Sequence, residues 1–167
     1  FPYTTLFRSY TEIEECTPVN TFSKSKLGGE ELIQTICKKY FIVRSSTIFG
    51  GNDCFVRKLI NGNHTSIYLF SNPTISITYI EDLALVLQKL LSTDKYGIYN
   101  YTNDGCISKS VLINSIIKFS NLNIPLVVSS DKLLSNLIPE PKYTCTDNSH
   151  IKEALGIEIA QIGRAHV

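Results

Sequence analysis

The chain has 167 residues, 43% of them hydrophobic, and a formal net charge of +1 from 16 basic and 15 acidic side chains. This length and apolar content suit one modest domain with a buried core, or part of a larger one. The balanced charge gives no indication of a surface for nucleic acid, and no apolar run approaches the roughly 20 residues needed to cross a bilayer.

Both ends of the chain match translated sequencing adaptors. Residues 1–9 match the translation of a common short-read sequencing adaptor, and residues 162–167 match the adaptor of the opposite end. We therefore expect residues 1–9 and 161–167 to be adaptor-derived and to lie outside the fold. Without the one arginine in each tail, 14 basic side chains face 15 acidic ones, a net charge of −1. The natural segment would be residues 10–160, a fragment of a longer protein.

A helix is predicted after an exposed, acidic loop at residues 10–17. It starts at Ser23 or Ser25 and runs to about Lys39, because apolar residues recur at helical spacing and two lysines lie at its end. Adjacent glycines within it, Gly28 and Gly29, each cost up to about 1 kcal/mol relative to alanine. The predicted apolar stripe consists of Leu27, Leu32, Ile33 and Ile36.

A short, nearly continuous apolar run follows at residues 40–49, which predicts a buried parallel strand. Its end carries the small polar residues Ser45, Ser46 and Thr47. Ligands collect at the carboxyl ends of the strands in doubly wound sheets, so this end is a candidate binding position. The alternative is a core strand that merely ends in small polar residues.

The rest of the chain alternates between predicted strands and helices. Strands are expected at residues 66–70, 76–79, 97–102 and 125–129. Helices are expected at residues 54–60, from about Asp82 to Ser92, 108–119, 131–137, and from Asn148 or Ser149 to Gly156. The positions expected to be buried on two of these helices are Leu83, Val86, Leu87, Leu90, Leu91, Val111, Leu112, Ser115, Ile116 and Phe119.

The five cysteines are widely spaced, and no Cys-x-x-Cys pair or nearby histidine suggests a zinc site. We therefore expect scattered, reduced thiols of the kind common in cytosolic proteins, and no metal. His64 and His150 are isolated, and neither is assigned a catalytic role.

One stretch carries a motif. Residues 18–30 read Pro-Val-Asn-Thr-Phe-Ser-Lys-Ser-Lys-Leu-Gly-Gly-Glu. They resemble the active-site segment of extended short-chain dehydrogenase/reductases, and in particular the dTDP-4-dehydrorhamnose reductases, with the pattern Pro-x-Asn-x-Tyr-Gly-x-Ser-Lys-x-x-Gly-Glu. The chain departs from this pattern in two places, because Ser23 replaces a glycine and Phe22 replaces the catalytic tyrosine. It matches at Pro18, Asn20, Ser25, Lys26, Gly29 and Glu30.

The resemblance implies what Phe22 and Lys26 would do. In the family, the tyrosine hydroxyl gives its proton to a carbonyl oxygen as hydride arrives from the nicotinamide. Residues four apart share a helix face, and the lysine lowers the tyrosine pKa and hydrogen-bonds the nicotinamide ribose. Phe22 keeps the ring and loses the acid, so Lys26 would keep only the ribose contact. Taken alone, the pair would be an ordinary core aromatic and a surface lysine.

Two later segments extend the resemblance. The segment from Arg44 to Thr47 is similar to the Arg-Thr-Ser-Trp that follows the same strand in the family, and its spacing from Lys26 matches without a gap. This places Ser46 near the nicotinamide and puts Thr47 where the family has an aromatic residue that contacts the sugar. Residues 77–84 resemble the family's Pro-Thr-x-x-x-Asp-Leu-Ala, although Asp82 is expected to favour the helix dipole rather than to bind a ligand.

The fold implied by the resemblance is α/β, the C-terminal part of an extended Rossmann fold with a small substrate-binding part. Residues 10–102 would belong to the Rossmann-like domain and residues 103–160 to the substrate-binding part. The glycine-rich turn that holds the dinucleotide pyrophosphate does not occur in this chain. We therefore expect the cofactor site, for NAD or NADP, to be incomplete here.

The resemblance favours an NAD(P)-dependent sugar-nucleotide reductase, with a nucleotide sugar as substrate, in the cytoplasm and as a homodimer. Neither nucleic acid nor membrane is expected as a partner. Two alternatives stay open. The parent protein could be a sugar epimerase or dehydratase, or it could be a non-catalytic sugar-nucleotide- or dinucleotide-binding regulatory protein, which Phe22 favours.

Overall fold

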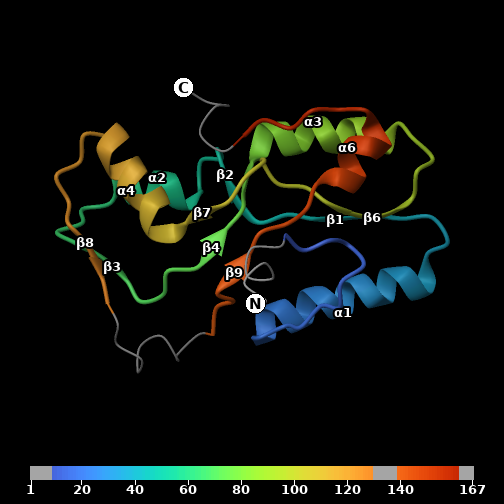
Figure 1. Cartoon of the computed structure of the whole chain (residues 1–167), viewed down its shortest axis with the longest axis horizontal. Helices are drawn as coiled ribbons and strands as arrows, with labels where there is room; N and C mark the ends of the chain where they lie inside the picture. Colours follow the sequence, from blue (N-terminus) through green and yellow to red (C-terminus); the bar gives the residue numbers. More distant parts are fainter. Residues whose placement is uncertain (1–8, 130–138, 162–167) are drawn as a thin grey trace, which may run out of the picture.

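The structure is a computed structural model that describes residues 9–129 and 139–161. Helices and strands alternate along the chain (Figure 1). In chain order they are α1 (Thr21–Ile36), β1 (Phe41–Arg44), β2 (Thr47–Phe49), α2 (Phe55–Asn61), β3 (Ile67–Leu69), β4 (Thr74–Ile75), β5 (Ile77–Tyr79), α3 (Ile80–Leu91), β6 (Gly97–Asn100), β7 (Ile107–Ser108), α4 (Lys109–Phe119), β8 (Leu126–Val128), β9 (Tyr143–Thr144) and α6 (Ser149–Leu155).

Most strand pairs are parallel. The pairs β1–β6, β2–β5 and β3–β8 are parallel, and each joins strands that are distant in the sequence. In the three-stranded sheet β7–β4–β9, the middle strand is antiparallel to β7 and parallel to β9. Parallel pairing with intervening helices is the α/β arrangement predicted from the sequence.

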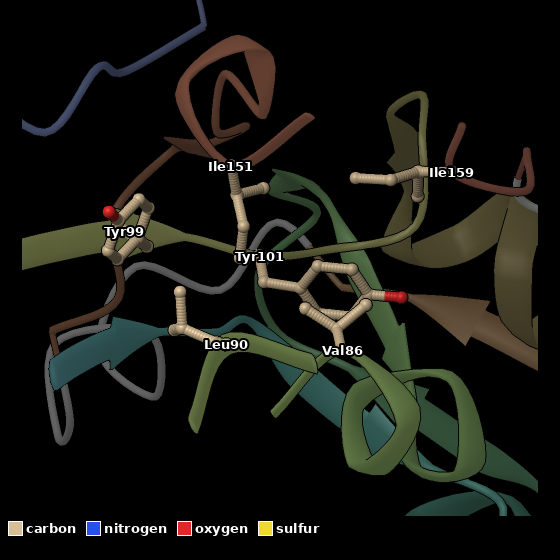
Figure 2. Packing of buried hydrophobic residues seen from close by; sticks show 6 residues of the cluster. All are labelled: Val86, Leu90, Tyr99, Tyr101, Ile151 and Ile159. Atoms are coloured by element: carbon tan, nitrogen blue, oxygen red, sulfur yellow. The ribbon is translucent and has the colours of Figure 1, made fainter. Parts of the chain in front are cut away.

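The largest core cluster lies on one face of the β1–β6 pair. Helices α3 and α6 cover this face, whereas α1 lies along the opposite side (Figure 1). Figure 2 shows the six side chains of this cluster pointing toward one another. They are Val86, Leu90, Tyr99, Tyr101, Ile151 and Ile159. Because α6 packs against β6, the end of the chain returns to the first strand pair.

Helix α1 differs from the prediction in its bounds and in its burial. It starts at Thr21 because the Asn20 side chain caps it, and it ends at Ile36 rather than near Lys39. None of its 16 described residues is buried. Leu32 and Ile36 are 62% and 75% exposed, so the expectation of a packed apolar stripe is wrong in this chain.

The predicted strand at residues 40–49 is two strands. Its first part, β1, pairs with β6, and its second part, β2, pairs with β5. Ser45 and Ser46 lie between them, where the chain passes from one ladder to the other. Only the part up to Arg44 therefore belongs to the pair beneath the main core.

The other predicted strands and helices agree with the structure only in part. The strands expected at residues 66–70, 76–79, 97–102 and 125–129 are present in shortened form, and α6 ends at Gly156 in a left-handed conformation, φ 61°. Strands β4, β7 and β9 were not predicted. The helix expected at residues 131–137 lies outside the described residues. Three residues expected to be buried are instead largely exposed, namely Leu91, Val111 and Phe119.

The cysteine prediction is wrong for one pair. Cys106 and Cys145 form a disulfide, whereas Cys16, Cys37 and Cys54 are free. The two bonded residues are 39 positions apart in the sequence, and spacing gives no hint of their contact. They meet because β7 and β9, which they adjoin, both pair with β4.

No helix in the described part of the chain is both long enough and apolar enough to cross a membrane.

Candidate active site

The N-terminus of α1 is held by a single asparagine. The Asn20 Oδ1 atom accepts a hydrogen bond from the Ser23 backbone N–H at 2.9 Å, which satisfies one of the free donors at the helix start. Its Nδ2 atom donates to the Pro139 carbonyl oxygen at 3.0 Å. Asn20 therefore begins the helix and also ties it to the loop that precedes β9.

Phe22 and Lys26 lie one helical turn apart on α1. The Lys26 Nζ atom is 5.4 Å from the centroid of the Phe22 ring, within cation–π range. Phe22 is 70% exposed, which excludes the alternative of an ordinary core aromatic in this chain. A phenyl ring carries no ionisable proton, so this face of α1 offers the Lys26 cation and the Phe22 ring but no acid at position 22.

Two adjoining cavities open beside this face. The larger, of about 950 Å³, is lined by all four site residues proposed from the sequence, Phe22, Lys26, Ser46 and Thr47. The smaller, of about 380 Å³, is lined by the Tyr10–Val19 loop and by α1. The residues that line both cavities are Phe22, Ser23, Lys26, Glu30, Arg44, Pro141, Thr144 and Thr146.

A two-pronged ion pair joins α1 to β1 beneath the cavities. The Arg44 Nη2 atom lies 2.7 Å from Glu30 Oε2, and its Nε atom lies 3.0 Å from the same oxygen. The hydrogen bond from Arg44 to Glu30 raises the arginine pKa above its ordinary value, although burial acts against it. The side chains are only 22% and 19% exposed. Such forked pairs fix direction as well as distance, so this one sets how α1 lies on β1.

The loop before α1 is anchored, although the sequence predicted an exposed loop there. The Glu12 Oε1 atom accepts a hydrogen bond from the Asn100 backbone N–H at 2.7 Å, and the Glu12 side chain is 11% exposed. The Glu12 carbonyl also accepts from Arg44 Nη1 at 3.2 Å. Asn100 Nδ2 donates to the Tyr10 carbonyl at 2.9 Å. Glu12 could not be recognised from the sequence, because a lone glutamate in a polar segment gives no sign of such contacts.

The far side of the larger cavity carries a second charged pair. The Lys109 Nζ atom lies 3.2 Å from each carboxylate oxygen of Glu140, and the Ser71 hydroxyl donates to the same carboxylate. Burial raises the pKa of the Glu140 carboxyl, but the Ser71 hydrogen bond and the Lys109 charge outweigh it, so the pKa lies below its ordinary value. Glu140 is therefore ionised near neutral pH.

Within the described ranges, no group of three or more histidine, cysteine or acidic residues could hold a metal ion. The polar groups of the larger cavity are instead amines, hydroxyls and the two ion pairs described above. They suit a polyhydroxylated organic ligand, since the amines and hydroxyls donate hydrogen bonds and the hydroxyls and carboxylates accept them.

Comparison with known proteins identifies the family of this chain. The family model described as RmlD substrate binding domain matches residues 4–165. The spore coat polysaccharide biosynthesis protein SpsK of Bacillus subtilis is 31% identical over 148 residues, covering 87% of this chain and 52% of that protein. The dTDP-4-dehydrorhamnose reductase of Aggregatibacter actinomycetemcomitans is 30% identical over 174 residues, covering 93% of this chain and 58% of its own length.

Among solved structures, dTDP-4-dehydrorhamnose reductase from Bacillus anthracis in complex with NADP superposes with a TM-score of 0.83 at 25% identity. The match covers 92% of this chain and 56% of that one, so the chain spans about half the length of its relatives. These matches confirm the α/β, Rossmann-type fold and the resemblance carried by residues 18–30. The chain belongs to the RmlD substrate binding domain family, within the extended short-chain dehydrogenase/reductases.

Proposed function

We propose that this chain is part of an NAD(P)-dependent sugar-nucleotide oxidoreductase of the dTDP-4-dehydrorhamnose reductase type. The observation that carries the proposal is the larger cavity, in which Phe22 and Lys26 of α1 face the same space as Ser46 and Thr47. Residues from α1 and from the junction of β1 and β2 line this one cavity, which supports the site roles that the resemblance implies. Relatives named for dTDP-4-dehydrorhamnose support a nucleotide sugar as the substrate.

The residues present fit one end of the cofactor. The Lys26 amine is exposed and Ser46 is half-buried in the wall of the cavity, and both can hydrogen-bond a ribose or carboxamide group. The glycine-rich turn needed for the pyrophosphate does not occur in this sequence. When bound, the reduced cofactor would supply hydride to a carbonyl carbon of the sugar.

The chain's own residues would then orient the substrate and balance charge. As a carbonyl gains hydride, negative charge develops on its oxygen, and a nearby cation stabilises it. Lys26 is a cation on the face of α1 that lines the larger cavity, whereas Phe22 can only pack against the sugar or the cofactor. The position that carries the proton-donating tyrosine in the family therefore carries no acidic group here. Activity in this form of the protein depends on the replacement of that tyrosine by Phe22.

Phe22 also supports a second candidate, a non-catalytic sugar-nucleotide- or dinucleotide-binding protein that kept the fold without the acid. A third, a sugar epimerase or dehydratase, is consistent with the same family features. An epimerase or dehydratase would convert a nucleotide sugar without net consumption of reduced cofactor, so product analysis separates it from a reductase. A cytoplasmic location and a homodimer stay predictions.

The test is a single added hydroxyl in the full-length natural protein. General acid catalysis contributes about 10²–10⁴-fold, so Phe22→Tyr should raise the turnover of carbonyl reduction by at least about tenfold and barely change cofactor affinity. The assay follows NAD(P)H oxidation with a 4-keto-deoxysugar nucleotide, with Lys26→Ala as the control that removes the cation. No turnover in either form supports the binding protein. High activity in the unsubstituted protein would show that another group supplies the proton.

A further inference from the structure

The Cys106–Cys145 disulfide lies across the end of the three-stranded sheet. In the register of this sheet, Ile75 of β4 stands opposite Ile107 on one side and opposite Thr144 on the other. One position further, the same two registers bring Cys106 and Cys145 to either side of Ser76. The Cα atoms of the two cysteines are 6.0 Å apart. The bridge therefore joins the outer strands over the middle one.

Ser76 reinforces this junction. Its side chain is buried, 1% exposed, and its hydroxyl donates to the Gly105 carbonyl at 3.3 Å while lying 3.8 Å from the Cys106 Sγ atom. The same oxygen accepts a hydrogen bond from the Thr146 backbone N–H at 3.4 Å. One hydroxyl thus contacts both bridged segments, next to the disulfide that links them.

The bridge also adjoins the candidate site. The residues before and after Cys145, Thr144 and Thr146, line both cavities. The Cys145 carbonyl accepts a hydrogen bond from the Tyr10 backbone N–H at 2.8 Å, which anchors the loop that forms the wall of the smaller cavity. A change at Cys145 would therefore be transmitted to the walls of both cavities.

The two cysteine residues differ in access to solvent. Cys106 is exposed, whereas Cys145 is 0% exposed. In thiol–disulfide exchange, an accessible thiolate attacks first and a neighbouring thiol completes the exchange. This asymmetry assigns the attacking role to Cys106 and the resolving role to Cys145.

We propose that Cys106 and Cys145 are a redox-active pair, a reversible modification site whose oxidation fixes the cavity wall formed by Thr144 and Thr146. The oxidant is a small-molecule disulfide. The Cys106 thiolate attacks it, forming a mixed disulfide and releasing one small thiol. The Cys145 thiolate then attacks the Cys106 sulfur and releases the second small thiol. Two protein thiols are oxidised, one small disulfide is reduced to two thiols, and the two protein protons pass to the released thiolates.

The first test counts thiols and does not depend on enzymatic activity. The chain of residues 1–167 is reduced and then equilibrated in a glutathione buffer with the reduced form in excess, so that an unpaired thiol is not held as a mixed disulfide. It is then quenched with acid, unfolded and alkylated. We expect three of the five cysteines to be alkylated, and a Cys106–Cys145 linked peptide by mass spectrometry. Reduction with dithiothreitol should restore all five. Five labelled thiols after oxidation, or a bridge that involves Cys16, Cys37 or Cys54, would overturn the proposal.

The second test asks whether the bridge controls the cavity wall. Backbone hydrogen exchange at Tyr10 and Thr146 should be at least about tenfold faster in the reduced than in the oxidised chain, because opening of this segment is no longer opposed by the crosslink. The Cys106→Ser variant, which cannot form the bridge, should exchange like the reduced chain under both oxidising and reducing conditions. Cys54→Ser, which leaves the pair intact, should respond like the unsubstituted chain. Equal exchange rates in the oxidised and reduced chain would overturn the coupling.

Discussion

Helices α1 and α3 both carry apolar residues at helical spacing, and they are held to the same strand pair in different ways. On α3, Val86 is 6% exposed and Leu90 is 0% exposed, and both lie in the main core (Figure 2). On α1, no residue is buried among the 16 that the structure describes. The two helices lie on opposite sides of β1 and β6 (Figure 1).

The difference shows what holds each helix. Burial of apolar side chains at roughly 25 cal/mol per Å² stabilises α3. For α1, the specific contacts are polar and localised, namely the Asn20 cap with its bond to Pro139 and the Glu30–Arg44 ion pair. The helix that carries Phe22 and Lys26 is therefore positioned by directional contacts. These can be removed singly, which makes the comparison testable.

Shortening a core leucine should have the largest effect. Leu90→Ala leaves a cavity among α3, α6 and β6, and we expect the free energy of unfolding to fall by about 2–5 kcal/mol. The matched control, Leu32→Ala on the 62% exposed position of α1, should change it by less than about 0.5 kcal/mol. Urea denaturation followed by circular dichroism measures both. Equal losses would mean that α1 packs as α3 does.

Breaking the ion pair should have the next largest effect. Glu30→Gln leaves the Arg44 guanidinium without its carboxylate in a setting that is only 22% exposed, and we expect a loss of about 2 kcal/mol in the free energy of unfolding. The rate of backbone hydrogen exchange along α1 should also increase in the Glu30→Gln variant. Glu31→Gln, one residue on and exposed, is the control and should change little. A neutral result at Glu30 would refute the idea that this pair positions α1.

High pH should lower the free energy of unfolding through Tyr101, which lies in the main core. Burial raises the pKa of Tyr101 from 10.0 to about 12. A raised folded-state pKa contributes stability that is complete below the unfolded pKa and is lost as pH rises between the two values. From about pH 9 to about pH 11, Tyr101 should therefore account for a loss of about 1.4 kcal/mol in the free energy of unfolding. Tyr101→Phe removes this contribution, so its unfolding curves should depend less on pH across that window.

The helix cap should have the smallest effect. Asn20→Ala removes the side-chain acceptor for the Ser23 N–H, which costs about 1 kcal/mol in the free energy of unfolding. Asn20→Asp keeps the acceptor and loses only the donor to Pro139, so most of the stability should remain. Thermal unfolding of the three proteins ranks them. An alanine variant as stable as the aspartate variant would show that the contact to Pro139 matters more than the cap.

Helix periodicity predicted elements better than it predicted burial. The helices α3, α4 and α6 occur close to their predicted positions, because apolar spacing is a local property of the sequence. Leu91 and Phe119, the last residues of α3 and α4, continue the apolar pattern but are exposed at 70% and 81%. Whether an apolar residue is buried depends on which other element packs against it, and the spacing of residues within one helix gives no information about that.

By itself, the sequence determined the helix positions, the family motif at residues 18–30 and the place of Phe22 where the family has tyrosine. These follow from spacing within a few turns, where each residue's neighbours are known from its number. Only the tertiary structure decided that Ser46 and Thr47 face α1, that Glu30 binds Arg44, that Glu12 anchors to β6 and that Cys106 meets Cys145. Each of these contacts joins segments that lie apart in the sequence, and which segments meet is set by the whole fold rather than by their own residues.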